Sequence, residues 1–577
     1  TTAATGGNDG RVGWYALANH FEETGWRDLS NSNTSSALAT VSWREGPASA
    51  DLHLAHTESK LTGNGPQSVD LFAFAPRSVF TAPDRTQNFF SGVTAHASDK
   101  LGADVVLSAT AFARRVDTRS YNGDVSSAGP CADDAAVLCD EAGTPLADPR
   151  GAPISTAYDA VDNIGVRRQS SAGGSLQAVF KEEWFGRENQ FVAGIDLTHG
   201  RVDYRASAQA AYFVPFAGDP YSVVAVPGPD IAIADANLAA RISETNAGAY
   251  ATDTWAVSDA LALTLSGRYN RTRTQIRDAG GDPDLDGDHA FHRFNPAAGL
   301  TYAFSRTLNA YAGASESTRA PTPVELTCAS ADAPCRLPND FLADPPLRQV
   351  VAHSVEAGFR GDFASALHWQ AGVFRTVNSH DILFQATGGA QSNQGFFANV
   401  GATRRQGADV SLSGKAADGR LDWYANATLV DATFRTAFVE RSVHHPDADT
   451  AGFIAVARGD RLPGVPRRAF KAGADWALTP ELAVGCGIVY NSKIYLRGDE
   501  ADLLRPLGGY ALANLRARYR LGAHAAVFAR VDNALDRRYA NFGVLGDAAV
   551  LHPAIADPHF ASPGAPRAAW IGLDLDF

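Results

Sequence analysis

Hydrophobic and polar residues alternate with a period of two along many short segments of this chain. In the last segment, residues 568–577, Ile571, Leu573 and Leu575 share one parity and Asp574 and Asp576 the other. Successive side chains of a β-strand project to opposite faces, so the alternation predicts a strand with one apolar and one mostly polar face. A strand of a soluble sandwich would show the same pattern. The choice between a soluble sandwich and another all-β fold therefore depends on how the pattern repeats along the chain.

The alternating segments come in pairs, joined by a tight polar turn at one end and a long loop at the other. Clear examples of the turns are Ser258-Asp259, Ser305-Arg306 and Gly361-Asp362. Soluble sandwiches and propellers do not keep all their long connections at one end over roughly twenty strands. The pattern predicts an all-β fold, a large transmembrane antiparallel β-barrel with long extracellular loops and short periplasmic turns. Closing the sheet removes its edges, as burial in a bilayer requires.

Within this pattern, residues such as Phe191, Ala193, Ile195 and Leu197 form one face of a strand. Long loops are predicted after residue 115, for some fifty residues, and at about 201–241 and 379–395. The last strand runs from the loop end to the turn end, which places the C-terminus at the periplasmic end.

Composition narrows the choice of function. The formal net charge is −13 and the 50 Lys and Arg residues are scattered, so nucleic acid is not an expected partner. The sequence has no run of eighteen apolar residues, which a membrane barrel does not need. It contains no Met. We therefore expect a chain that is processed or excised from a longer one.

Four of the five cysteines form two short-range pairs within predicted loops. Cys131 and Cys139 have seven residues between them, and Cys328 and Cys335 have six. Such spacing predicts two local disulfides, which belong in an oxidising compartment. A four-cysteine zinc site is the alternative, but no CxxC spacing supports it. Cys486 is predicted to be an unpaired strand residue that is buried or faces lipid.

The segment VDNALDRRY, Val531 to Tyr539, resembles the V-x-N-L-F-D-x-x-Y signature of TonB-dependent outer-membrane receptors, with Asn533 and Asp536 at matching positions. Four further segments agree in order, and the terminal Phe577 resembles the signal by which such barrels are recognised for insertion. These segments are STRAPTPVEL, DPPLRQVVAHSVEAGFRG, NVGATRRQGADVSL and LPGVPRRAFKAG.

The resemblance spans nearly the whole chain and implies a barrel of about 20–22 strands in the outer membrane of a Gram-negative cell. It also implies nutrient import coupled to TonB through a plug domain. The beginning of the chain departs from the family, because residues 14–28 match its third strand and the following loop. We therefore expect residues 1–577 to be a barrel domain truncated at its N-terminus, without the plug and the TonB-contacting box.

Several loop residues are candidates for ligand binding. Asp282, Asp284, Asp286 and Asp288 resemble the first half of a calcium loop, but Arg293 stands where the final Glu is needed. A solvated acidic loop tip is the favoured interpretation. His53 and His56 differ in strand parity and are not expected to share a metal.

Other candidates lie nearer to the predicted outer loops. His444 and His445, with Asp447 and Asp449, are candidate metal ligands, although a polar loop is favoured. Arg404-Arg405 and Arg467-Arg468 are candidates for contact with an anionic ligand or lipopolysaccharide, or else are ordinary rim charges. The loop aromatics Phe384, Phe396 and Phe397 are predicted either to contact a ligand or to pack loop against loop.

The favoured function is a transport receptor for a scarce nutrient, by family frequency a ferric siderophore. The alternative is a passive channel or a surface-binding barrel. No catalytic set or phosphate-binding loop is present, so neither an enzyme nor a cofactor is expected. Expected partners are a small metal chelate, outer-membrane lipid and lipopolysaccharide, the barrel-assembly machinery and TonB, with a monomeric receptor.

Overall fold

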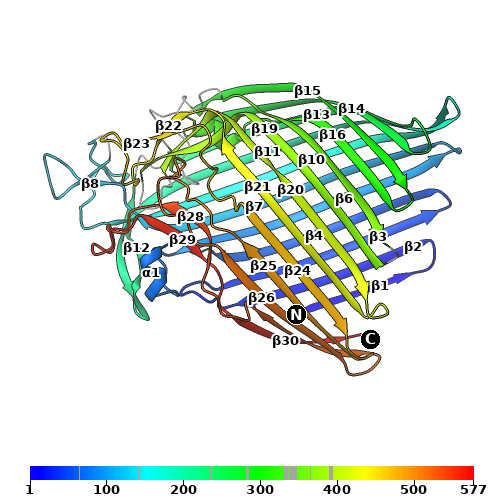
Figure 1. Cartoon of the computed structure of the whole chain (residues 1–577). Coiled ribbons are helices and arrows are strands. Elements are labelled where there is room, and N and C mark those ends of the chain that lie inside the picture. Colours follow the sequence, from blue (N-terminus) through cyan, green and yellow to red (C-terminus); the bar gives the residue numbers. More distant parts are fainter. Residues whose placement is uncertain are drawn as a thin grey trace.

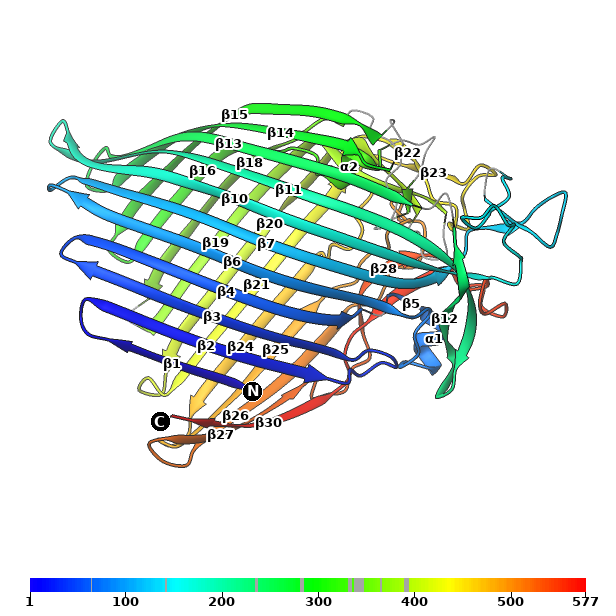
Figure 2. The same ribbon diagram turned by 180° about the vertical axis from the view of Figure 1, so that it is seen from behind.

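The computed structural model shows one large, tilted, twisted β-sheet that curls into a barrel (Figures 1 and 2). It describes the chain apart from residues 64, 141–142, 234–236, 281–284, 330–334, 337–346, 364–365, 389–393 and 577. No helix among the described residues is long and apolar enough to cross a membrane.

Of the 23 strands that the described residues contribute to this sheet, β12 and β17 pair with the loop ends of longer strands and the other 21 form the wall. The first wall strands are β1 (Thr2–Asn8), β2 (Val12–Glu23), β3 (Ser32–Glu45), β4 (Ala48–Thr62), β6 (Asp84–Leu101), β7 (Val105–Val125) and β10 (Ala160–Trp184). They continue with β11 (Arg187–Phe216), β13 (Leu238–Ala256), β14 (Leu261–Asp278), β15 (Gly287–Ser305), β16 (Leu308–Arg319), β18 (Val350–Phe363) and β19 (Leu367–Gly388). The last are β20 (Gln394–Ala416), β21 (Leu421–Phe434), β24 (Arg468–Ala477), β25 (Leu482–Asn491), β26 (Tyr510–Arg520), β27 (Ala525–Asp532) and β30 (Ala568–Leu575).

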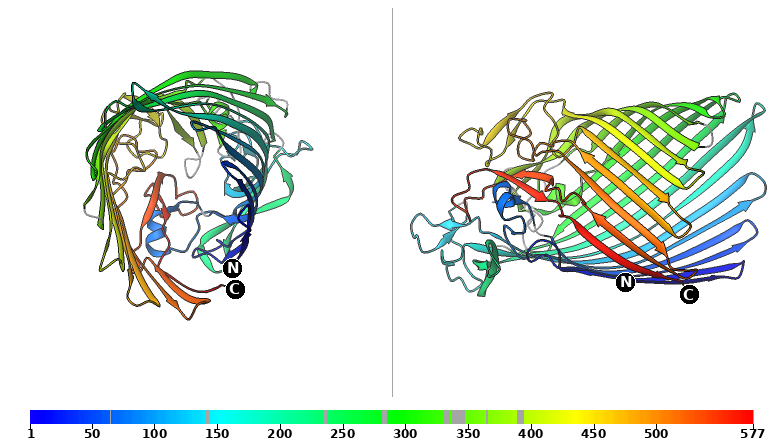
Figure 3. Two further views of the ribbon diagram at one scale, coloured as in Figure 1. Left: turned by 90° about the vertical axis from the view of Figure 1, so that its right-hand side faces the viewer. Right: turned by 60° about the horizontal axis from the view of Figure 1, so that its bottom comes forward.

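Each wall strand pairs antiparallel with the next one along the chain, and β1 and β30 are the two edges of the sheet. Viewed along the barrel, these edges lie beside each other, with the two chain ends at the seam (Figure 3, left). Because direction alternates over 21 strands, β1 and β30 both run toward the short-turn end.

The register separates an apolar row from a polar row. Leu176, Ile195, Ala249, Tyr269 and Phe294 face one another across five neighbouring strands, and the four large residues of this row are about half exposed. Residues directly paired across strands project to the same side of a sheet. The neighbouring row is Ser175, Asp196, Gly248, Asn270 and Arg293. The apolar row therefore faces lipid and the polar row the lumen, as the sequence pattern predicts.

Two of the predicted long loops are wrong. Residues 201–216 continue β11, in which residues 209–216 pair with β12 (Asp219–Ala232), and residues 379–388 continue β19. The pattern also fails to identify β10. The physical reason is that apolar alternation reports contact with the bilayer, whereas the backbone ladder continues beyond the membrane. There the side chains contact water or folded loops, as Tyr204 and Ala206 of β11 do in a buried cluster with Leu326. The length of the wall strands varies from 30 residues in β11 to 8 in β27 and β30 and 7 in β1.

Short elements form an outer layer at the loop end. They are β5 (Gln67–Ser68), α1 (Val69–Phe74), β8 (Gly129–Pro130), β9 (Leu138–Cys139), α2 (Pro323–Thr327), β17 (Cys335–Arg336), β22 (Phe438–Arg441), β23 (Phe453–Val456), β28 (Ala540–Leu545) and β29 (His559–Pro563). In Figure 3 (left), α1 and the β28–β29 hairpin lie inside the ring. The outer loops thus fold inward and narrow the mouth.

Candidate ligand-binding lumen and mouth

The lumen face carries polar side chains that bond to one another. Arg268 donates two hydrogen bonds to the carboxylate of Asp196, at 2.7 and 2.8 Å, and another to Oδ1 of Asn270 at 2.6 Å. The Tyr250 hydroxyl donates to Oε1 of Gln177 at 2.7 Å, and the Arg268 guanidinium lies 5.5 Å from the Tyr250 ring centre. Sheet register alone brings these residues of β10, β11, β13 and β14 together.

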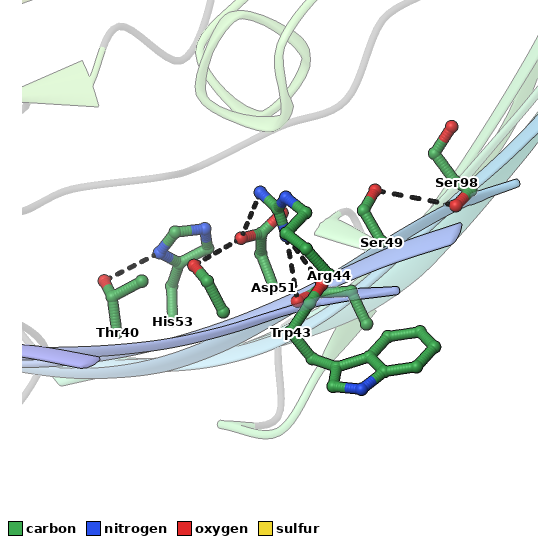
Figure 4. Close-up of polar contacts among 9 residues, drawn as sticks. Thr40, Trp43, Arg44, Ser49, Asp51, His53 and Ser98 are labelled. Carbon is green, nitrogen blue, oxygen red and sulfur yellow. Dashed lines mark hydrogen bonds and ion pairs between the residues drawn. The ribbon is translucent and has the colours of Figure 1, made fainter. Parts of the chain in front are cut away.

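The same arrangement recurs on β3 and β4 (Figure 4). Arg44 donates to both carboxylate oxygens of Asp51, at 3.0 and 3.1 Å, and Nδ1 of His53 lies 2.9 Å from the Thr40 hydroxyl. Trp43, one residue before Arg44, projects to the opposite side of the sheet in the figure. A single step along the strand thus changes the environment from lumen to lipid.

A lumen cavity of about 550 Å³ lies against β7, β10, β11 and β13. Its charged lining residues are Arg114, Arg167 and Glu244, and Pro323 and Val324 of α2 border it toward the mouth. Two cations and one anion give this wall a local positive balance. The cavity is large enough for part of a small-molecule ligand.

The STRAPTPVEL segment explains how α2 is held over that cavity. The Thr322 hydroxyl accepts from the Glu325 backbone N–H at 3.2 Å, and the Glu325 carboxylate accepts from the Thr322 N–H at 2.7 Å. This reciprocal capping box is joined by an ion pair between Arg319 and Glu325 at 2.6 Å. Leu326 is fully buried beneath the helix.

The inward-folded loops have hydrophobic cores of their own. On β21, the lumen-facing Phe434 packs with Ile454, Val456 and Leu462 from the following loop. A second cluster joins Phe80 and Phe560, whose ring centres are 5.0 Å apart. Burial of these side chains packs the mouth loops against one another.

Beneath the loop core lies a buried acidic cluster that the sequence analysis did not identify. His445 Nε2 lies 3.1 Å from Asp499 Oδ1, with both side chains fully buried. Glu440 and Glu500 share a hydrogen bond, and burial together with the neighbouring carboxyl raises the pKa of Glu440 well above its ordinary value. Burial also raises the pKa of Glu500. About sixty residues separate the two glutamates, so no local spacing could reveal the pair.

The structure joins Cys131 and Cys139 by a disulfide. Cys328 is also disulfide-bonded, whereas the side chain of Cys335 lies outside the described residues. Cys486 is free and exposed; it shares strand parity with the outward-facing Ile488 of β25. The loop around Cys131 is therefore pinned by a covalent link.

The candidate metal ligands are engaged elsewhere. Asp288 pairs with Arg273 at 2.7 Å, and Asp286 accepts from the Asp278 backbone N–H; Asp282 and Asp284 lie outside the described residues. Among the described residues, no group of three or more His, Cys, Asp or Glu side chains could hold a metal ion.

The candidate histidines have other partners. His445 belongs to the buried pair with Asp499, the Asp447 N–H donates to its other ring nitrogen, and Asp449 caps a turn through the Ala451 and Phe453 N–H groups. His444 also has an interaction partner. Their arrangement stabilises the loop.

The paired arginines are divided by strand parity. Arg404 contacts Asp431 at 3.0 Å, whereas Arg405 points to the other face, with Asp381 at 3.6 Å. Arg467 and Arg468 are exposed where β24 begins. The structure therefore does not bring these four side chains together into one site.

The aromatic candidates lie at the upper ends of β19 and β20. The rings of Phe384 and Phe397 contact each other edge to face, with centres 5.2 Å apart, and Phe397 also packs on the core beneath α2. Phe396 faces Gln385 across the same strand pair. The first two side chains are thus used in packing between loops.

The segment from Val531 to Tyr539 forms a corner at the end of β27. The backbone of Asn533 has a positive φ of 46°, and its side chain accepts from the Arg537 N–H at 2.8 Å and donates to the carbonyls of Arg537 and Ala565. Asp536 accepts from the Arg567 N–H. The motif thereby ties the last loop to the start of β30. Phe577 lies outside the described residues.

A wall of this size, with an apolar exterior, a polar lumen and inward-folded outer loops, defines a large outer-membrane barrel. The chain belongs to the family described as TonB dependent receptor-like, beta-barrel, which it matches over residues 25–534. Barrels of this family lie in the outer membrane, and this places the chain there.

Two relatives and one solved structure illustrate the similarity. A probable TonB-dependent siderophore receptor, PiuA of Acinetobacter baumannii, is 26% identical over 202 residues, covering 35% of this chain and 24% of that protein. The ferric-pyoverdine BN7/BN8 receptor of Pseudomonas putida is 24% identical over 383 residues, covering 63% of this chain and 40% of that protein. Both matches thus span less than half of the relative.

The crystal structure of PiuA from A. baumannii superimposes with a TM-score of 0.71 at 14% identity. The superposition covers 100% of this chain and 79% of the PiuA chain. At this identity the likeness establishes the fold.

Proposed function

We propose that this chain is the barrel portion of a receptor that imports a ferric siderophore by TonB-coupled active transport. The observation that carries the proposal is the polar lumen beneath an ordered mouth, in a chain that belongs to the TonB-dependent receptor family. The names of its relatives, among them a siderophore receptor and a ferric-pyoverdine receptor, support iron chelates as the substrate class. The family consists of transport receptors, and the proposal assigns the chain no catalytic residue and no cofactor.

The proposal includes a longer receptor. An all-antiparallel ring needs an even number of strands, whereas 21 wall strands leave β1 and β30 pointing the same way. One further antiparallel strand would fit between these edges, and the PiuA chain is longer than this one. We assign a plug and the contact with TonB to such additional sequence. Insertion would require the barrel-assembly machinery, and the surrounding partners are outer-membrane lipids.

Uptake of radioactive iron by a deletion strain carrying the full-length gene tests this function. Catecholate, hydroxamate and carboxylate chelates are supplied in turn, with and without TonB. Uptake of at least one chelate that requires both the receptor and TonB is expected. Receptor-dependent uptake that persists without TonB, together with ion conductance by the full-length protein in planar bilayers, would favour the passive channel.

Two adjacent substitutions test the role of the lumen. Gly200 lines the cavity, and the nearest atoms to a Cβ built there are 3.8 Å away, so Gly200→Trp directs a large ring into free space. His199 lies one step along β11 and faces outward, so His199→Trp adds a similar ring on the other side. We expect the first variant to lower uptake severalfold and the second to leave it unchanged at equal surface abundance.

A further inference from the structure

The backbone ladder between β15 and β16 stops partway up the wall. Its last pair is Ala297 and Ser315, although each strand continues toward the loop end beside its other neighbour, β14 or β18. The Ala303 N–H donates to the Ala260 carbonyl, so odd-numbered residues of β15 bond to β14 and even-numbered ones face β16. Pro296 is the next even-numbered residue and has no N–H to donate. The two strands therefore separate above Ala297.

A recess in the lumen wall lies at this separation. It has a volume of about 270 Å³, and His292 of β15 lines it together with Thr318, Ala320 and Gln349. His292 shares strand parity with the outward-facing Phe294, so its backbone and not its ring reaches the recess. The Gln349 side-chain amide donates to the His292 carbonyl at 3.4 Å. The free edge of β15 thus already binds one amide group.

An acceptor without a donor lies at the same separation. The Asn295 side chain donates from Nδ2 to Oγ1 of Thr318 at 3.3 Å. Its carbonyl oxygen, Oδ1, is buried and has no hydrogen-bond partner among the described residues. A buried carbonyl without a donor is costly. The two sides of the separation are therefore incompletely bonded to each other.

The recess is neutral although arginines border it. Arg268 is paired with Asp196 at 2.7 Å, and Arg293 is paired with Glu316. On β13 and β14, the lining includes three uncharged polar side chains, which are Asn246, Asn270 and Thr272. Amide and hydroxyl groups both donate and accept hydrogen bonds, as a peptide group does. The recess therefore suits an uncharged, amide-rich part of a ligand.

The recess adjoins the cationic lumen cavity. Asn246 lines both the recess and the cavity of about 550 Å³. In that cavity, Arg114 donates to the Ser171 hydroxyl at 2.8 Å and Arg167 donates to the Thr118 hydroxyl at 3.4 Å. Within the described part of the chain, neither arginine has a carboxylate partner. A cationic cavity and a neutral recess thus lie side by side along one wall of the lumen.

We propose that the recess is a subsite for a peptide segment of the transported chelate, which joins the free edge of β15 as an added strand. This assignment rests on the proposed function. The anionic iron-binding head lies against Arg114 and Arg167, and the peptide extends from it past Asn246. The peptide N–H and C=O groups pair with those of β15 at His292 and Phe294. Strand addition uses backbone groups, so the recess recognises a peptide linker more than any one side chain.

Uptake of two synthetic ferric tris-catecholates by a deletion strain carrying the full-length gene tests the subsite. Both probes have the same iron-binding groups. One probe carries them on a tripeptide and the other on a hydrocarbon chain of equal length. With the wild type, the half-saturating concentration of the tripeptide probe should be lower by about fivefold, the contribution of one or two hydrogen bonds.

Two variants and a matched control locate the effect. Ala320→Phe places a ring in the recess and should raise the half-saturating concentration of the tripeptide probe to that of the hydrocarbon probe, whose uptake stays unchanged. Thr318→Val removes a hydroxyl at nearly constant volume and should reduce the preference in part. The control is Ala290→Phe, which adds the same ring on the outward face of β15 and should keep the full preference. Equal surface abundance and heat-modifiable electrophoretic mobility verify that each barrel is folded.

The subsite is wrong if the wild type takes up both probes with equal half-saturating concentrations, or if Ala320→Phe retains the preference. Uptake of hydroxamate chelates but of neither catecholate probe overturns the subsite while the transport function stands. Receptor-dependent uptake of no chelate at all overturns the transport function and the subsite with it.

Discussion

Raising the pH should loosen the mouth loops, because Glu440 and Glu500 retain a proton in a buried site. The two side chains are 2% and 3% exposed, and Oε2 of Glu440 has no hydrogen-bond partner. Asp499 adds further negative charge to Glu440, whereas Arg497 partly offsets it. Both carboxyl groups cannot ionise there without strong repulsion.

The direction and size of the effect follow from linkage. A carboxyl whose folded pKa is raised contributes stability that is complete below its ordinary pKa, near 4.3, and is lost as pH rises through the raised value. One retained proton changes the opening free energy by about 1.4 kcal/mol per pH unit in that window. Burial also raises the pKa of Asp502, to about 6. Measurements above roughly pH 6.5 therefore isolate the glutamate pair from Asp502.

The assay is hydrogen exchange of residues 438–456 and 496–503, corrected for the intrinsic dependence of exchange on pH. In the wild type, the free energy of opening should fall as pH rises, and Glu440→Gln should flatten that slope. Asp447→Asn, an exposed change in the same loop, is the control and should keep the wild-type slope. A slope of opposite sign in the wild type, or an unchanged slope in Glu440→Gln, would refute the reasoning.

Three further predictions concern the wall, the corner motif and the disulfide. Ile195→Arg should destabilise the barrel by about 2–4 kcal/mol in vesicles, because it places a charge against lipid. Ser175→Arg, in the neighbouring lumen row, should cost under about 1 kcal/mol. Equal urea midpoints for the two variants would contradict the assignment of faces. Asn533→Ala removes three hydrogen bonds and should cost about 1–3 kcal/mol by thermal unfolding, while Leu535→Ala, which is 75% exposed, should stay within about 0.5 kcal/mol. Cys131→Ser should speed proteolysis of the loop at 126–159 without shifting the unfolding temperature of the barrel; a loop as resistant as that of the wild type would show that the disulfide does not restrain it.

The sequence predicted the wall well because each membrane-facing strand must satisfy lipid on one side and water on the other. Ile195 and Asp196 illustrate this requirement within one step. The same signal disappears where strands leave the bilayer, and for this reason the pattern predicts loops at the upper halves of β11 and β19. The contacts within the mouth loops are harder still to predict from the sequence. Glu440 meets Glu500 through the folding of two separate loops, and neither position has a spacing that marks it.

The difference in strand length gives the receptor a slanted rim. At about 3.3 Å per residue, β11 extends roughly 100 Å and β25 roughly 33 Å, so one side stands well above the other. In Figure 2, the cyan loop between β7 and β10, which holds the disulfide, extends farther outward at this end than β12 does. A large object that arrives at the cell, such as a phage tail or an antibody, therefore contacts the taller side of the rim first. A small solute can approach the mouth from the side, over the shorter strands β24–β27.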